Sequence, residues 1–267
     1  MKTILLLVHD DGGQEARFQA ALDLTRTLDG HLVCLDVTIM PAMVVSDALG
    51  DAGFGMLLQE EKQRETTNRA KLEARLVHED VSWDWRDACG ELAPCLRDES
   101  ALADLIVVNR QLEACPVPDM RALAGDLVVK GRTPVLAVPE DLVRLDLDRA
   151  LIAWDGSASS GAAVRAAVPL LRHAQQVTII AIGDESDRLP AEAAAAYLSR
   201  YDIHAEIDHV ALAGEKVGDA LFARVSSGHF GYVVMGGFGH ARVAEALFGG
   251  VTRMMLTKSP VPIFLAH

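Results

Sequence analysis

Short, almost continuous apolar runs alternate along the chain with longer segments in which apolar residues recur at helical spacing. In the first half such runs cover residues 4–8, 31–37, 103–108 and 133–138, while residues 16–28 carry a helical pattern. Near-continuous apolar strands separated by helices are typical of a parallel sheet that is covered on both faces. The pattern therefore predicts an α/β fold.

The second half of the chain repeats the pattern of the first. The apolar run that ends at Asp10 matches the run that ends at Asp155, and each half closes in a proline-led strand, at Pro134 and at Pro262. The offset is 145 residues at the aspartates and 127 to 128 at the last two strands, so the first half carries about 18 additional residues. Strand positions place them near residues 40–56, a stretch rich in Gly, Ala and Met.

This repeat predicts two tandem doubly wound domains, each a five-stranded, mostly parallel sheet with helices on both faces. The first would span residues 1–140 and the second residues 149–267, with the charged residues 139–148 as the linker. Residues 81–85 alternate apolar and polar side chains, which is typical of a half-exposed edge strand.

Composition and charge narrow the classes of function. The net charge of −13 argues against nucleic acid or an anionic membrane surface as a partner. No apolar run approaches the roughly 20 residues that span a bilayer, and the N-terminal run turns polar at His9 like a first strand. Four scattered cysteines without a CxxC pair predict reduced thiols and a cytoplasmic location.

A glycine-rich segment near the C-terminus carries the strongest functional information. An apolar run ends at Met235 and is followed by Gly236 and Gly239, then, after nine further residues, by Gly249 and Gly250. Glycine lets backbone N–H groups approach an anion, and a helix N-terminus adds unpaired donors and a favourable dipole. The segment predicts a phosphate-binding loop; two unrelated turns that flank a helix are the alternative.

The tandem pattern, the aspartate after the first strand and the spacing Gly-x2-Gly-x9-Gly together resemble the universal stress protein family. The resemblance spans the chain and is stronger in the second half, where residues 152–157 match the family's first-strand signature. It implies an adenine nucleotide (ATP, ADP or AMP, with or without Mg²⁺) across the carboxyl ends of the strands. It also implies a stress-response sensor or adaptor whose closing strands pair as an intramolecular pseudo-dimer; further association into a homodimer stays open.

The same resemblance assigns the ligand contacts to the second half, residue by residue. Asp155 would lie beside the adenine or ribose, and it also suits a helix cap. Ala153, Trp154 and Ile182 would line the base pocket. Backbone groups that hold the ribose and phosphates would come from Met235, Gly236, Gly239, His240, Gly249, Gly250 and Val251.

The sequence departs from the family pattern at two places. The family has Ser or Thr directly after the final glycine, but this sequence has Gly250 at that position. Thr252 lies two residues further along the chain and does not simply replace the missing hydroxyl. One lost hydrogen bond to a charged group would weaken ATP binding by about one to two orders of magnitude. The first half has lost its loop glycines, with Asn109 and Arg110 after its fourth strand. We therefore expect a degenerate first half and one nucleotide per chain.

Two other classes of function remain open. The binding alternative keeps the fold but takes another small molecule or a protein partner near the Met-rich residues 40–56. The enzymatic alternative is a weak nucleotide hydrolase. No catalytic residue is assigned, because the sequence lacks a nucleophile elbow, a Walker lysine or a paired acid and base, and His240 has no orienting partner.

His9, Asp10 and Asp11 carry groups that can bind a metal ion. Three adjacent residues rarely point at one ion, however, and no second ligand pair stands out elsewhere. We expect a solvent-exposed strand end here and no metal site.

Overall fold

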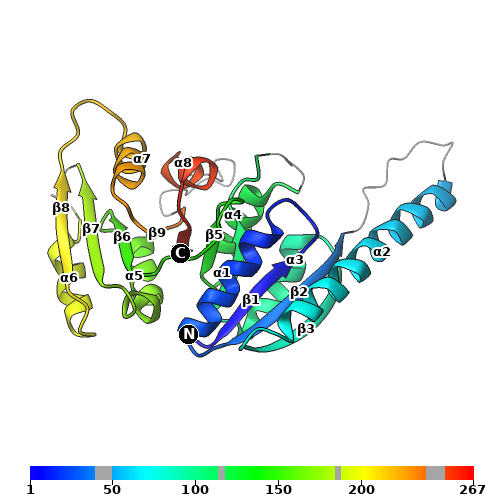
Figure 1. Ribbon diagram of the computed structural model, residues 1–267. Helices are drawn as coiled ribbons and strands as arrows, with labels where there is room; N and C mark the ends of the chain where they lie inside the picture. The colour runs from blue at the N-terminus through cyan, green and yellow to red at the C-terminus, as the bar shows by residue number, and fades with distance from the viewer. Residues whose placement is uncertain (40–49, 114–117, 184–187, 239–249) are drawn as a thin grey trace.

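Ten strands of the described chain join into one continuous sheet, with the order β3-β2-β1-β4-β5-β10-β9-β6-β7-β8 (Figure 1). The structure is a computed structural model that describes residues 1–39, 50–113, 118–183, 188–238 and 250–267. The predicted α/β fold of doubly wound tandem repeats is confirmed, because each half contributes five strands that are parallel to one another.

The elements of the two halves follow the same order. The first half contains β1 (Thr3–Val8), α1 (Gln14–Thr27), β2 (His31–Ile39), α2 (Gly50–Leu76), β3 (Ser82–Gly90), α3 (Leu92–Glu99), a short 3-10 turn (Ser100–Leu102), β4 (Leu105–Asn109), α4 (Met120–Lys130) and β5 (Val135–Val138). The second half contains β6 (Arg149–Trp154), α5 (Ala158–Leu171), β7 (Gln176–Ile182), α6 (Ala191–Ser199), β8 (Ala205–Val210), α7 (Val217–Ser227), β9 (Tyr232–Gly236), α8 (Gly250–Lys258) and β10 (Ile263–Ala266).

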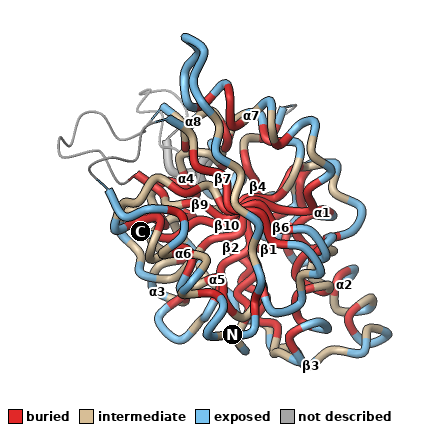
Figure 2. Tube along the Cα trace, turned by 90° about the vertical axis from the view of Figure 1, so that its left-hand side faces the viewer, coloured by how far each residue is buried: buried red, intermediate tan, exposed pale blue. Residues whose placement is uncertain are grey.

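The strands pack into two apolar cores, one on each face of the sheet. Helices α1, α2, α5 and α6 contribute to one core, and α3, α4, α7 and α8 contribute to the other. Figure 2 shows the buried strands at the centre of the molecule. β3 lies at one edge of the sheet and has no fully buried residue, as its alternating sequence predicts. Among the described residues, no helix combines the length and the apolar composition needed to cross a membrane.

The closing strands join the two halves. β5 and β10 pair antiparallel, with Leu136 opposite Phe264, so the predicted pseudo-dimer pairing is confirmed. The segment after β4 adds a second connection. Gln111 N–H donates to the carbonyl of Leu256 at 3.0 Å, and Arg110 Nη1 donates to the carbonyl of Thr257 at 3.0 Å. The C-terminal end of α8 is therefore held by the first half.

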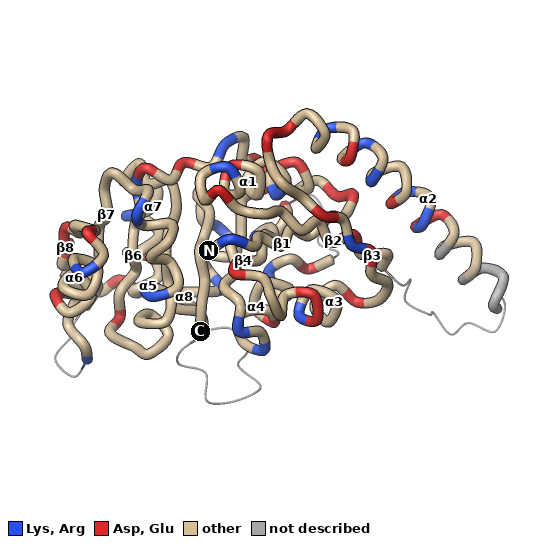
Figure 3. The backbone as a smooth tube through the Cα atoms, turned by 90° about the horizontal axis from the view of Figure 1, so that it is seen from below, with Lys and Arg blue, Asp and Glu red and all other residues tan. Residues whose placement is uncertain are grey.

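Part of the Gly-, Ala- and Met-rich stretch at residues 40–56 is helical, because α2 already begins at Gly50. Residues 40–49 lie outside the described part of the chain. The additional residues of the first half thus lengthen a helix, and its N-terminal turns extend beyond the rest of the described structure (Figure 1). Acidic and basic side chains both occur along α2 (Figure 3). Arg75 pairs with Glu15 of α1, and Arg69 pairs with Asp87 of β3, which docks the helix.

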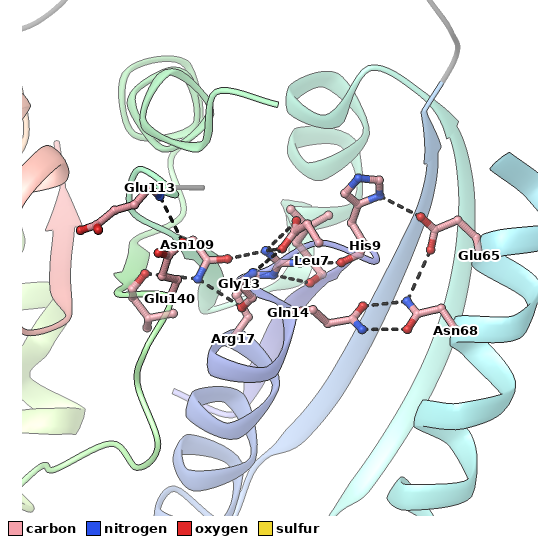
Figure 4. A network of polar contacts seen from close by, with 12 residues as sticks. Leu7, His9, Gly13, Gln14, Arg17, Glu65, Asn68, Asn109, Glu113 and Glu140 are labelled. Atoms are coloured by element: carbon pink, nitrogen blue, oxygen red, sulfur yellow. Dashed lines mark hydrogen bonds and ion pairs between the residues drawn. The ribbon is translucent and has the colours of Figure 1, made fainter. Parts of the chain in front are cut away.

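The expectation of a solvent-exposed strand end after β1 holds for Asp10, which is exposed, but is wrong for His9 and for the carboxylate of Asp11. His9 is 4% exposed, and the carboxylate of Asp11 pairs with the fully buried guanidinium of Arg17 at 2.9 Å. Arg17 also donates to the carbonyls of Leu7 and His9 and to the Asn109 side chain (Figure 4). One buried cation thereby ties the ends of β1 and β4 to α1.

We predict that Arg17→Met lowers the free energy of unfolding by about 3–5 kcal/mol, because Asp11 would keep a buried charge without its partner. The matched control is Arg26→Met on the same helix. Arg26 is 38% exposed, and exposed pairs contribute roughly 0–1 kcal/mol. Urea unfolding of both variants, followed by circular dichroism, checks this. Equal losses in the two variants would mean that Arg17 is not a structural anchor.

Candidate functional site

A cavity of about 370 Å³ opens in the second half at the carboxyl ends of β6, β7 and β9. It lies beside the point where the strand order reverses, between β6 and β9, and open α/β sheets commonly bind ligands at such a point. Its walls are mostly apolar, with a few polar residues. The lining residues are Ala153, Trp154, Asp155, Ser159, Ile180, Ile182, Arg188, Val217, Leu221, Met235, Gly236, Phe238, Gly250, Val251 and Thr252.

Eight of the eleven residues assigned from the sequence line this one cavity. They are Ala153, Trp154, Asp155, Ile182, Met235, Gly236, Gly250 and Val251. The other three, Gly239, His240 and Gly249, lie outside the described residues. The remaining lining residues were not assigned from the sequence. They come from β7, α5, α7, α8, the chain before α6 and the chain after β9.

Trp154 borders the cavity, but its indole packs on the opposite face of the sheet. Side chains alternate along β6, so Ala153 belongs to the core on the cavity side while Trp154 belongs to the core under α5 and α6. The indole Nε1–H donates to the carbonyl of Leu189 at 2.9 Å. Ala153 therefore faces the cavity, and Trp154 fixes the chain that leads to α6.

Asp155 and Arg188 form the polar rim of the cavity. Arg188 Nη1 donates to the backbone carbonyl of Asp155 at 3.1 Å and lies 3.7 Å from its carboxylate. The same carboxylate accepts from Ser157 N–H at 3.0 Å, and the Ser157 hydroxyl caps α5 by accepting from Ser160 N–H at 3.2 Å. Asp155 thus shapes the turn before α5 and also places a carboxylate at the rim. Arg188 supplies a cation that no motif in the sequence predicts.

The N-terminus of α8 forms the wall opposite the strand ends. Gly250, Val251 and Thr252 line the cavity, and the first N–H groups of a helix have no partner inside that helix. A Cβ added at Gly250 would meet nothing within 4 Å among the described residues, so a side chain has room at this position. Thr252 also reaches the cavity, although its place in the sequence seemed too late.

Gly236 is required by packing. A Cβ at this position would lie 2.5 Å from the backbone nitrogen of Ser160, because the end of β9 presses against the start of α5. In the first half the larger residue is on the strand and the glycine is on the helix. Asn109 ends β4, and a Cβ added at Gly13, at the start of α1, would collide with the Asn109 side chain. In the second half the glycine that permits this close contact ends the strand, and in the first half it stands at the start of the helix instead.

In the first half, the N-terminus of α4 corresponds to the N-terminus of α8 and is capped by a side chain of the protein. Asp119 caps α4, and its carboxylate accepts from Ala122 N–H at 3.0 Å. A negative side chain of the protein itself thus occupies donors that a phosphate would need. This arrangement agrees with the predicted degeneracy of the first half.

No protein-family model and no curated protein sequence matches the chain. Solved structures do match it along its whole length. A universal stress protein from Archaeoglobus fulgidus DSM 4304 superposes with a TM-score of 0.78 at 15% identity, covering 99% of this chain and 95% of that one. A functionally unknown protein from Pseudomonas aeruginosa PAO1 gives a TM-score of 0.64 at 15% identity, covering 100% and 92%. The resemblance is thus confirmed at the level of architecture: the chain has the tandem fold of a universal stress protein.

Proposed function

We propose that the second half binds an adenine nucleotide in the cavity between β6 and β9. The observation that carries this proposal is that one cavity combines apolar walls with the open N-terminus of α8. Its volume of about 370 Å³ falls within the range of small-molecule sites. Ile180, Met235 and Leu221 offer apolar surface for a flat base. The N–H groups of α8 suit phosphate oxygens.

Local donors must hold the phosphates, because the net charge of −13 repels an anion. The dipole of α8 favours negative charge at its N-terminus, and Arg188 adds a cation at the rim. Asp155, which lies beside Arg188 on the same rim, would accept hydrogen bonds from the ribose hydroxyls. ATP, ADP and AMP, with or without Mg²⁺, share the base and the ribose, so these contacts serve each of them.

A sensor or adaptor role has a physical route through α8. Phosphate would bind at the N-terminus of this helix, while Gln111 and Arg110 of the first half hold the carbonyls of Leu256 and Thr257 near its C-terminus. A shift of α8 on binding would therefore reach the first half directly. A cytoplasmic stress-response role belongs to the same proposal.

We expect Ala153→Phe to weaken ATP, ADP and AMP binding by at least roughly tenfold, because the ring would fill the base pocket. The control is Ala196→Phe, on the exposed side of α6 and away from the cavity. Isothermal titration calorimetry on both variants measures the effect. Unchanged affinity in Ala153→Phe, with its fold intact by circular dichroism, would place the ligand elsewhere.

Gly250→Ser should strengthen ATP binding by about one to two orders of magnitude, because it adds a hydroxyl donor at the helix end. A side chain at Gly250 meets no neighbour, so the fold should tolerate it. Gly12→Ser, at an equally open glycine of the first half, should leave the affinity unchanged. Calorimetric titration of ATP into the parent and both variants measures the change in affinity. No gain at Gly250 would contradict the placement of the phosphates at α8.

We predict one nucleotide per chain, because Asp119 caps the corresponding helix of the first half. Native mass spectrometry at saturating ATP should show a single mass increment. Two bound nucleotides per chain would contradict the predicted degeneracy.

A further inference from the structure

A second cluster of ligand-type side chains lies in the first half, away from the nucleotide cavity. His9 follows β1, while Glu61 and Glu65 lie one turn apart on α2. One donor atom from each of these three residues lies within 4.8 Å of the other two. His9 and Glu65 are almost completely buried, at 4% and 2% exposure, so this is not a surface group of acids.

The facing atoms of this cluster have few partners of their own. His9 Nδ1 and Glu65 Oε1 lie 2.8 Å apart, and neither makes a hydrogen bond to another described group (Figure 4). The other carboxylate oxygen of Glu65 faces Asn68 Nδ2 at 3.4 Å, and Gln14 holds the Asn68 amide through two hydrogen bonds of 2.7 Å. The Glu65 carboxylate is thus oriented by a polar layer behind it.

Asp36 of β2 points to the same region. Leu32 and Cys34 of β2 share a core with Leu72 of α2, so Asp36, on the same face of the strand, also faces α2. Asp36 is 5% exposed, and its Oδ1 has no hydrogen-bond partner among the described residues. Asp36 thus adds a third carboxylate to the region around His9, Glu61 and Glu65.

The neighbouring cations are engaged elsewhere or lie outside the cluster. Arg17 pairs with Asp11, and Arg69 pairs with Glu73 and Asp87. Arg64 pairs with Glu61 at 2.7 Å, but it is 45% exposed and 3.8 Å from Glu65. A divalent ion would supply the missing positive charge inside the cluster.

We propose that His9, Glu61 and Glu65 bind a divalent transition-metal ion, with Zn²⁺ as the best fit and Asp36 facing the site as a further carboxylate. Imidazole nitrogen with carboxylate oxygens is a donor set of zinc sites, whereas Mg²⁺ and Ca²⁺ prefer oxygen alone. Two ligand atoms each about 2.1 Å from a tetrahedral ion lie roughly 3.4 Å apart. His9 Nδ1 and Glu65 Oε1, now 2.8 Å apart, would therefore separate by roughly half an ångström to admit the ion between them. The ion would link the long helix α2 to the end of β1.

The alternative is a plain His9–Glu65 ion pair that docks α2 without a metal. Calorimetric titration of ZnCl₂ into the EDTA-treated full chain separates the two. We expect one Zn²⁺ per chain, with affinity reduced at least roughly tenfold in Glu61→Gln and Glu65→Gln. Glu73→Gln on the same helix and His209→Gln on the exposed strand β8 are the controls and should bind as the parent does.

Glu61→Gln keeps the test valid if the more buried variants fold poorly, because the Glu61 side chain is 15% exposed. X-ray absorption spectroscopy of the zinc-loaded parent needs no variant and should show one imidazole with carboxylate oxygens around the ion. Absence of zinc binding, equal binding by Glu61→Gln, or a shell with sulfur or several imidazoles would overturn the proposal. ATP titrations are independent of this outcome, since the nucleotide cavity lies in the other half.

Discussion

The direction of the strands is the constraint on which the rest of the structure depends. Five parallel strands in each half end at the same edge, and β6 and β9 send their following helices to opposite faces of the sheet. A crevice must open between two such strand ends. In the second half it is lined by Ala153 and Met235 on the sheet and by α8 across from it. The site is thus a consequence of topology, and the side chains decide what it can hold.

The two halves use this shared geometry differently. Where β9 ends in Gly236 against Ser160, β4 ends in Asn109 against Gly13, and the buried guanidinium of Arg17 occupies the space behind it. Asp119 caps the last helix of the first half, whereas Gly250, Val251 and Thr252 at the start of the corresponding helix line the cavity. In the first half, polar groups that bond to one another stabilise the fold and leave few donors for a ligand.

Much of the fold could be predicted from the sequence, because apolar strands and the repeat at Asp10 and Asp155 are local patterns. Eight of the residues that line the cavity could be named in advance because the resemblance to the universal stress protein family carries them over position by position. Arg188 could not, since nothing near it in the sequence marks its approach to Asp155. The burial of His9 was missed for the same reason: its partner Glu65 lies on a helix 56 positions further along, and only the tertiary structure joins them.

A crystal structure of the full chain soaked with AMP is the most direct test of whether the cavity between β6 and β9 accepts an adenine nucleotide. We expect the base between Ala153 and Leu221, and the phosphate within hydrogen-bond distance of the first N–H groups of α8. A cavity filled by the chain's own residues, or AMP bound at another place on the protein, would contradict this expectation.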